Sequence, residues 1–337
     1  MKSTLFIMGP DDFGRSSFSG GNGSFRDASS ITVKGVLPIY PYISEEDKIK
    51  NNSFLFILGL NESIQLENKD KSTNVVNLIG DADGSKKTLK AVNLLIKSPQ
   101  FNRVFNHPED IYKTSRVNLS RLLNGISNVK IARVEVFYIE TIEDLNNNIK
   151  NTFMSYPLII RLEGFHNSEF MVRVDSEDDL IGLTSWLDQK RSFIIIEYID
   201  CIDTLGLYRK ARIAVIDGKF YPQHFLTSKN WCVGADARYN LMLEHKQFRD
   251  AEQHYLESFN TNILPHYKKQ LLLIHEKIGL DIYGIDCFFG ENGELVIFEL
   301  NACMDLLSMW LGPNGEYNYK KPFRSAVSNA IIDLIAN

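Results

Sequence analysis

Short apolar runs alternate with polar connections over the first hundred residues, a pattern that predicts several strands and one helix. Strands are expected over residues 4–8, 33–40, 54–58 and 75–79. Residues 86–96 repeat their apolar side chains at helical spacing. Strand and helix in alternation favour a small Rossmann-like α/β domain with a largely parallel sheet over residues 1–106. The glycines at 20, 21 and 23 match no phosphate-loop pattern, so a flexible loop is expected there rather than an anion cradle.

The middle of the chain predicts a second region, residues 107–200. A helix is expected over residues 108–125, a strand over 128–137, and a further helix that opens at Thr141 with a capping pattern. Three more strands are expected over 156–162, 170–174 and 193–199. The last is continuously apolar, which is typical of a strand buried on both faces. It runs into Asp200-Cys201-Ile202-Asp203, a polar connection that indicates a hinge between two lobes.

A cationic strand is predicted over residues 208–216, where polar and apolar side chains alternate. Lys210 and Arg212 share one face, and Asp217-Gly218 is a strong signal for a two-residue hairpin. That turn places Gln223 opposite Arg212 and His224 on the other face. Two cations on one face repel each other unless an anion lies between them; the alternative is a solvated basic face.

The hairpin over residues 283–301 carries the most informative chemistry. If Asn292 and Gly293 centre its turn, Asp286 lies opposite Glu299, Asn301 joins their face, and Phe298 and Leu300 point into the core. Carboxylate and amide oxygens are hard ligands that suit Mg²⁺. The hairpin therefore predicts a metal site at Asp286, Glu299 and Asn301. The alternative is that the carboxylates pair with distant basic residues or face water.

Beyond the second region, helices are expected over residues 241–256, 267–278 and 325–335. The charged first one is either a mobile insertion or a contact between copies in a homo-oligomer. The apolar run 302–310 fits a core segment better than a substrate pocket.

Composition is that of a globular protein of 337 residues, with 44% hydrophobic and 23% charged residues. The net charge of -5 argues against a general nucleic-acid partner. The four cysteines are scattered, which supports neither a zinc site nor a disulfide framework. No stretch matches a signal peptide or a membrane span, so a cytoplasmic protein without a membrane partner is expected.

The order of these parts resembles the ATP-grasp superfamily, the fold of glutathione synthetase and D-alanine–D-alanine ligase. The resemblance covers about residues 106–307. It rests on Gly284-Ile285-Asp286 with Phe298-Glu299-Leu300-Asn301-Ala302, on Tyr208-Arg209-Lys210-Ala211-Arg212, and on Tyr221-Pro222-Gln223-His224 with Ser228 and Trp231. It implies an α/β protein in which a small N-terminal domain precedes two lobes, residues 107–200 and 201–337.

The resemblance also implies roles for individual residues. Asp286, Glu299 and Asn301 would hold one or two Mg²⁺ ions against the phosphates of ATP. Arg161 stands where the family usually has a lysine, and Lys113 or Arg116 supplies the other basic residue of the first lobe. The backbone of Glu197, Tyr198 and Ile199 would face the adenine and Asp203 the ribose. Lys210 would approach the phosphates, and Arg212 the acyl phosphate or the acceptor's carboxylate.

The implied activity is the ATP-dependent joining of a carboxylate to an amine through an acyl phosphate, on an amino acid, peptide or other small molecule. One departure from the family concerns its glycine-rich phosphate loop. Here the loop over residues 161–168 keeps only Gly164, places Glu163 nearby and offers His166 as a side-chain donor. Two alternatives therefore stand beside the ligase: a non-catalytic nucleotide-binding protein, and a small-molecule kinase that uses the same site.

Overall fold

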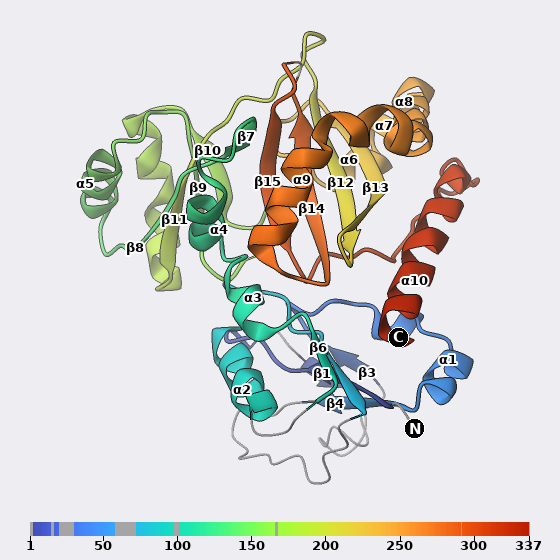
Figure 1. Ribbon diagram of the computed structural model, residues 1–337. Helices are drawn as coiled ribbons and strands as arrows, with labels where there is room; N and C mark the ends of the chain where they lie inside the picture. Colours follow the sequence, from blue (N-terminus) through green and yellow to red (C-terminus); the bar gives the residue numbers. More distant parts are fainter. Residues whose placement is uncertain are drawn as a thin grey trace.

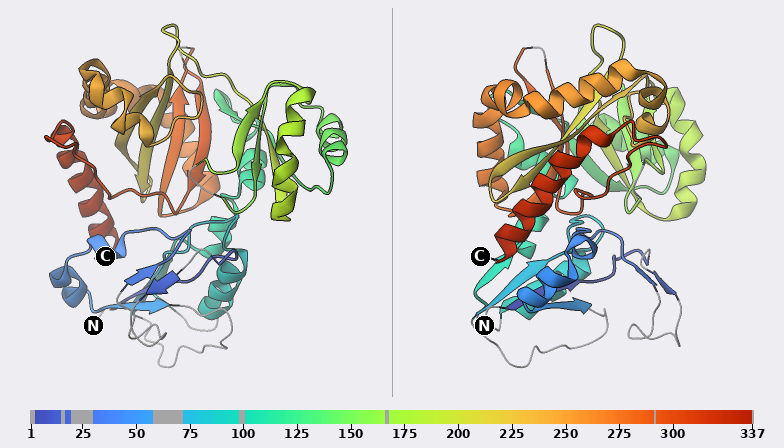
Figure 2. Two further views of the ribbon diagram at one scale, coloured as in Figure 1. Left: turned by 180° about the vertical axis from the view of Figure 1, so that it is seen from behind. Right: turned by 90° about the vertical axis from the view of Figure 1, so that its right-hand side faces the viewer.

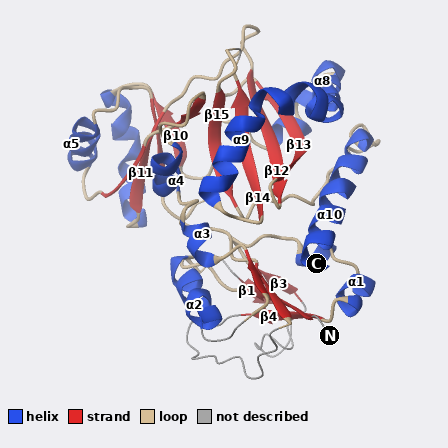
Figure 3. Cartoon of the chain, in the orientation of Figure 1, coloured by secondary structure: helices blue, strands red, loops and turns tan. Residues whose placement is uncertain are grey.

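The computed structural model describes residues 3–14, 17–19, 30–57, 72–97, 101–165, 168–290 and 292–336. The expected glycine loop near residue 20 and His166 lie outside these ranges. Three bodies are visible in Figure 1: an N-terminal domain, a first lobe, and a second lobe beside it. Helices and strands are distributed over all three, as Figure 3 shows.

The N-terminal domain contains a parallel sheet in the order β4-β1-β5-β6. Its elements are β1 (Ser3–Met8), β2 (Ser17–Ser19), β3 (Ser30–Thr32), α1 (Glu45–Lys50), β4 (Ser53–Ile57), β5 (Thr73–Asn77), α2 (Lys86–Lys97) and β6 (Arg103–Phe105). This confirms the expected parallel α/β arrangement. The strand expected over residues 33–40 is absent from the described chain: Val36 makes one isolated bridge to Ile79, and Tyr40–Tyr42 is a turn of 3₁₀-helix. Pro38 and Pro41 interrupt that segment, and proline cannot donate to a sheet ladder.

The first lobe is an antiparallel sheet in the order β10-β9-β11-β8. Its elements are α3 (Pro108–Tyr112), α4 (Arg116–Leu123), β8 (Val134–Tyr138), α5 (Ile142–Thr152), β9 (Leu158–Leu162), β10 (Met171–Val174), the 3₁₀-helix Glu177–Gln189 and β11 (Ser192–Glu197). The capping box predicted at Thr141 forms: its hydroxyl accepts from Asp144 N at 3.0 Å, and Asp144 accepts from Thr141 N at 3.1 Å.

The second lobe is a sheet in the order β13-β12-β14-β15-β7. Its strands are β7 (Val129–Ile131), β12 (Tyr208–Ile216), β13 (Lys219–Ser228), β14 (Ile282–Phe289) and β15 (Leu295–Asn301). Its helical elements are α6 (Asp236–Tyr239), α7 (Leu241–Glu244), α8 (Lys246–Ser258), the π-helix Phe259–Ile263, α9 (Leu264–Ile278), the 3₁₀-helix Asn318–Lys320 and α10 (Lys321–Ala336).

Three elements expected to be continuous are interrupted, and one of them, the helix expected over 241–256, divides at His245 into α7 and α8. The helix expected over residues 108–125 breaks at Thr114 and Ser115, because Ser115 leaves helical geometry and caps α4 by accepting from Asn118 N at 3.4 Å. The strand expected over 128–137 splits into β7, which pairs with β15 of the second lobe, and β8, which pairs with β11 of the first. The chain therefore crosses between the lobes at this point.

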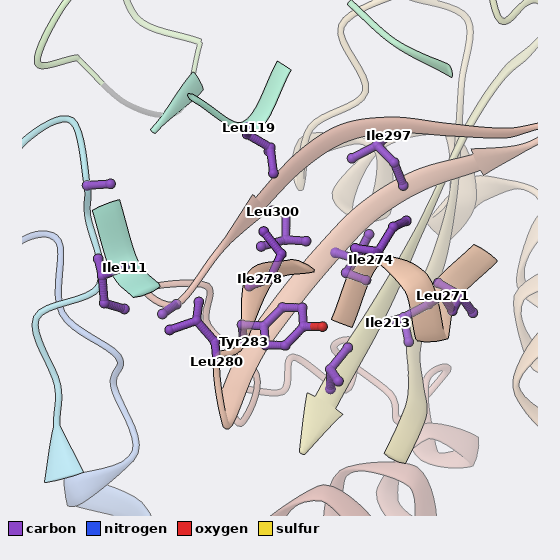
Figure 4. Packing of buried hydrophobic residues seen from close by; sticks show 14 of the residues in the cluster. Ile111, Leu119, Ile213, Leu271, Ile274, Ile278, Leu280, Tyr283, Ile297 and Leu300 are labelled. Atoms are coloured by element: carbon purple, nitrogen blue, oxygen red, sulfur yellow. The ribbon is translucent and has the colours of Figure 1, made fainter. Parts of the chain in front are cut away.

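Separate hydrophobic cores show how the three bodies are joined. The first lobe has a core of its own, which includes Leu145, Leu158 and Phe193. In the second lobe, α9 packs on the sheet through Leu271, Ile274 and Ile278 (Figure 4). Residues of the N-terminal domain share clusters with the second lobe, and α10 runs between these two bodies, as both views of Figure 2 show. The sheet of the first lobe therefore has a core separate from the core that the other two bodies share, whereas Ile111 and Leu119 of α3 and α4 belong to the shared core.

Asn106 fastens the N-terminal domain to the start of β14. It is fully buried with a φ of 52°, and its Oδ1 accepts from Ile282 N at 2.8 Å and from Asp281 N at 3.0 Å. Its Nδ2 donates to Ile282 O at 2.7 Å. The domain boundary expected after residue 106 is thus tied to the second lobe by hydrogen bonds.

Candidate functional site

A cavity of about 1550 Å³ lies where the three bodies meet. Its wall includes Lys34 and Asp81 of the N-terminal domain, Arg161 and Tyr198 of the first lobe, and Arg212 and Glu299 of the second. A space of this size accommodates a nucleotide together with a second small molecule.

A row of charged side chains crosses three adjacent strands on the cavity wall. Arg212 of β12 pairs with Asp286 of β14, and Asp286 pairs with Glu299 of β15. Directly paired residues of antiparallel strands share a face, so these side chains are neighbours. The predicted pairing of Asp286 with Glu299 is therefore present.

Asp286 is the centre of this row and is 2% exposed. Arg212 donates to its two oxygens from Nε at 2.6 Å and from Nη2 at 3.0 Å, and Lys210 Nζ lies 3.1 Å from Oδ2. Burial by itself raises the pKa of this carboxyl, but Arg212 and Lys210 outweigh burial and hold the pKa well below its usual range. Asp286 is therefore an anion that two cations already neutralise.

His224 extends the row, contrary to the sequence prediction. We expected Gln223 opposite Arg212, but the register shifts by one residue between Arg212 and Ile213, and Arg212 pairs with His224. The reason is Pro222, which lacks the N–H that a regular ladder needs and is accommodated in strands at bulges. The bulge brings His224 onto the face that lines the cavity.

A second bulge corrects another prediction. Phe289 pairs with Leu295, which centres the turn on Asn292, and the register then shifts between Asp286 and Cys287. The extra residue is Phe298, which is 42% exposed and lines the cavity instead of entering the core as expected. Leu300 is buried as predicted.

The oxygen ligands predicted for Mg²⁺ all line the cavity. Glu299 is half-buried and lies 3.4 Å from Arg116 Nη2, while Asn301 Oδ1 accepts from Cys303 N at 3.0 Å. In the described part of the chain, no group of three or more His, Cys, Asp or Glu side chains is arranged to hold a metal. Glu299 and Asn301 carry the hard oxygens that Mg²⁺ prefers, whereas both oxygens of Asp286 are engaged by cations.

The basic residues of the first lobe separate into two environments. Arg116 lines the cavity and donates from Nη1 to Asp83 Oδ2 at 2.8 Å. Burial opposes its charge, but Glu299 and Asp83 outweigh burial and raise its pKa. Lys113, the other candidate, does not line the cavity: its amine pairs with Asp110 at 2.6 Å and donates to Ile278 O at 3.1 Å. The break before α4 explains the difference, because it turns Arg116 away from the face that carries Lys113.

Arg161 lies on the cavity wall beside Arg116. Burial, followed by the charge of Arg116, lowers the pKa of Arg161 to about 10, so it remains a cation at neutral pH. Its Nη2 donates to Phe165 O, while its Nε has no hydrogen-bond partner among the described atoms. Arg116 and Arg161 repel each other, and Glu299, Asp83 and Asp81 offset part of this repulsion.

The loop after Arg161 is fastened to the N-terminal domain. Glu163 pairs with Lys86 at 2.8 Å. A Cβ on Gly164, whose φ is +85°, would lie 2.8 Å from the ring of Phe13 and 2.7 Å from Arg191 Nη1. Arg191 in turn lies over the Phe13 ring at 4.3 Å. Glu163, whose negative charge seemed misplaced, therefore has a partner outside the cavity.

The connection after β11 forms another part of the wall. Glu197, Tyr198 and Ile199 all line the cavity. Asp203, which was expected to face a ribose, does not line the cavity. Its carboxylate accepts from Leu205 N and Leu207 N at 2.9 Å each and pairs with Arg209 at 2.8 Å, so it stabilises its own turn.

Several further charged residues on the wall were not predicted, among them Asp81, Asp83, Arg238 and Lys320. Asp81 and Asp83 come from the turn before α2, Arg238 from α6, and Lys320 from the 3₁₀-helix before α10. The acidic pair between a strand and a helix offered a recognisable signal. Arg238 and Lys320 lie in segments without a pattern, so only the tertiary fold identifies them.

Comparisons with known proteins agree with this architecture. No family model matches the sequence, and neither does any curated protein. Among solved structures, a RimK domain ATP-grasp protein from Sphaerobacter thermophilus matches with a TM-score of 0.54 at 10% identity, over 99% of this chain and 100% of that one. D-alanine–D-alanine ligase from Bacillus anthracis, complexed with ATP, matches with a TM-score of 0.53 at 14% identity, over 99% and 96%.

A third match is the macrocyclase MdnC from Microcystis aeruginosa, bound with its precursor peptide MdnA. Its TM-score is 0.52 at 13% identity, over 99% of both chains.

Among the described residues, every helix is too short or too polar to cross a bilayer. Taken with the two lobes and the cavity between them, these likenesses show that the chain adopts the ATP-grasp fold.

Proposed function

We propose that this protein is an ATP-dependent ligase that joins the carboxylate of an amino acid or peptide to an amine through an acyl phosphate. The observation that carries the proposal is the row Arg212–Asp286–Glu299 on the wall of a cavity that also receives Arg116 and Arg161. Cations on two sides of a cavity, with hard oxygens between them, suit a polyphosphate and its metal.

ATP would lie with its adenine against residues 197–199 and its phosphates between Arg116, Arg161 and Lys210. Glu299 and Asn301 would hold Mg²⁺, which neutralises charge on the phosphates when bound. Because the first lobe has its own core, it can close over the nucleotide and exclude water that would hydrolyse an acyl phosphate.

In the first step a carboxylate oxygen of the substrate attacks the γ-phosphorus, the bond to the bridging oxygen breaks, and ADP leaves. The cations Arg161 and Lys210 counter the charge that develops on the transferred group. In the second step the amine nitrogen attacks the acyl carbon, phosphate leaves, and the amine proton passes to solvent. Arg212, held in place by Asp286, is positioned to stabilise the developing oxyanion.

The test is to incubate the protein with Mg²⁺, ATP and pools of amino acids and peptides, and to measure ADP and phosphate. Glu299→Gln is expected to abolish the activity. Glu294→Gln is the matched control, because Glu294 pairs with Lys130 at 2.8 Å outside the cavity. The absence of substrate-stimulated ADP release with every pool would contradict the proposal. Mass spectrometry separates an amide, expected of a ligase, from a stable phospho-product, expected of a kinase.

One observation favours a second candidate, a non-catalytic nucleotide-binding protein. Both oxygens of Asp286 are engaged by Arg212 and Lys210, which leaves fewer hard oxygens for a metal. Calorimetry distinguishes the two functions: tight ATP binding without turnover supports this candidate, and ADP release stimulated by a substrate rejects it.

A further inference from the structure

Positive charge gathers at one end of the cavity, where three distant segments meet. His224 comes from β13, Arg238 from α6, and Lys320 from the turn before α10. This charge affects His224: burial, followed by four nearby cations, holds its pKa well below the ordinary value. Those cations are Arg212, Arg238, Lys320 and Lys210. His224 is therefore a neutral imidazole that can accept or donate one hydrogen bond on each nitrogen.

Lys320 is a buried residue, 7% exposed, whose amine makes no hydrogen bond or ion pair within the described chain. Burial is the main cause that lowers its pKa to about 8, with Arg238 and Arg212 adding to that effect against Glu252. The amine is therefore still mostly charged at neutral pH, and a buried charge is costly unless something pairs with it.

The carboxylate that acts against the lowering of the Lys320 pKa is already engaged. Glu252 is fully buried, accepts from Tyr319 Oη at 2.6 Å and Phe225 N at 3.2 Å, and lies 3.7 Å from Arg238 Nη2. It balances one cation, so Arg238 and Lys320 together keep an excess of positive charge.

This end of the cavity also contains hydrogen-bonding nitrogens that lack a partner among the described atoms. Arg238 Nε, Arg238 Nη2 and His224 Nε2 are buried and have no hydrogen-bond partner among the described atoms. Buried donors without an acceptor are rare in folded proteins, because each loses its hydrogen bonds to water without gaining another. An oxyanion would supply the missing acceptors and the missing negative charge at once.

We infer that Lys320, Arg238 and His224 bind a second acidic group of the substrate, a carboxylate or a phosphate. This inference rests on the proposed function in one respect, that the occupant of the cavity is the substrate of a ligase. Arg212 remains paired with Asp286 and acts on the carboxyl group that is activated. The substrate class is then a small acid or acidic peptide that carries one anionic group beyond the group that is activated.

The experiment is calorimetric titration of the full-length protein with glutarate, monomethyl glutarate and inorganic phosphate, with and without saturating ADP. The variants are Lys320→Met and Arg238→Gln. Lys321→Met is the matched control, because Lys321 is adjacent, exposed and off the cavity wall. We expect wild type and Lys321→Met to bind glutarate or phosphate equally, and Lys320→Met and Arg238→Gln to bind at least tenfold more weakly.

Monomethyl glutarate has one carboxylate where glutarate has two, so it tests whether the second anionic group is needed. It is expected to bind wild type at least tenfold more weakly than glutarate. Preference for glutarate assigns a carboxylate to the subsite, and preference for phosphate assigns a phosphate. Lys320→Met should keep the wild-type melting temperature or exceed it, because it removes a buried charge. If it does not fold, Arg238→Gln carries the comparison.

Two outcomes overturn the inference: no anion binds wild type, or Lys320→Met and Arg238→Gln bind anions as tightly as Lys321→Met does. Failure of the proposed function gives a different pattern. Anion binding that depends on Lys320, without ATP turnover on any substrate pool, leaves the subsite standing and removes the ligase. ATP turnover together with unchanged anion binding in the variants supports the ligase and removes the subsite.

Discussion

The Arg212 guanidinium grips the Asp286 carboxylate side-on, from Nε at 2.6 Å and Nη2 at 3.0 Å, across two paired strands. Such a two-point contact fixes the plane of both groups. It orients Arg212 toward the cavity and removes Asp286 from solvent. The pair therefore joins two strands and fixes Arg212 on the wall of the cavity.

The stability contributed by this pair should depend on pH. Asp286→Asn leaves Arg212 and Lys210 buried without their anion, which is expected to cost about 3 kcal/mol of unfolding free energy at pH 7. The folded-state pKa of Asp286 is depressed, so its contribution is present above the pKa of about 4 of an unfolded aspartate and is lost as the pH falls below it.

Urea titrations between pH 7 and pH 3 check this expectation. The difference between wild type and Asp286→Asn should shrink steadily below about pH 4, the ordinary carboxyl range. Asp250→Asn is the control, because it breaks an exposed ion pair with Lys246 and should change stability by less than about 0.5 kcal/mol. A difference that stays constant with pH would contradict the role of the Asp286 charge.

The placement of Arg116 and Lys113 predicts unequal effects on nucleotide binding. Arg116→Met removes a cation from the cavity wall and should weaken binding of ATP with Mg²⁺ about tenfold, the equivalent of one charge-assisted hydrogen bond. Lys113→Met removes a cation that is paired with Asp110 outside the cavity and should leave affinity unchanged. Calorimetric titration of both variants gives the comparison, and equal losses would show that the cavity is not the nucleotide site.

The strands of the second lobe were accessible from the sequence because their alternation and turn signals are local. β12 begins and ends where expected, and Asp286 does pair with Glu299. The pairing of Asp286 with Glu299 was predicted correctly, but from a turn position that differs from the observed one. The turn is centred on Asn292 instead of between Asn292 and Gly293, and the bulge at Phe298 restores the register.

Other parts could not be derived from local pattern. Lys113 and Arg116 are three residues apart, so a continuous helix places them on one face, and only the break at Ser115 separates them. The bulge at Pro222 was signalled by the proline itself, although the two-residue turn dominated the prediction. Arg238 and Lys320 meet His224 through tertiary packing alone, which no periodicity in the sequence encodes.

Gly164 offers a test of whether the loop between β9 and β10 acts on the nucleotide. Gly164→Ala introduces a Cβ into the Phe13–Arg191 contact at a positive φ, which is expected to cost about 1–2 kcal/mol and to displace the loop. ATP affinity should fall several-fold. Gly182→Ala is the matched control in the same lobe, because its Cβ would meet open space. Calorimetry of both variants decides, and unchanged affinity in Gly164→Ala would exclude the loop from binding.

Asn106 tests whether the N-terminal domain and the second lobe unfold as one unit. Asn106→Ala removes three side-chain hydrogen bonds to Asp281 and Ile282 and leaves buried backbone groups unpaired, which should cost about 3 kcal/mol beyond the backbone strain. Asn128→Ala isolates that strain, because Asn128 is exposed and has a φ of 60°; it should cost only about 1 kcal/mol.

Hydrogen exchange of the two variants locates the effect. In Asn106→Ala, protection should fall together in β6 and at the start of β14, since Asn106 directly follows β6 and its side chain bonds Asp281 and Ile282 at the start of β14. The separate core of the first lobe should keep its protection. Loss of protection confined to β6 would instead show that the N-terminal domain unfolds independently, and that the cavity does not depend on this joint.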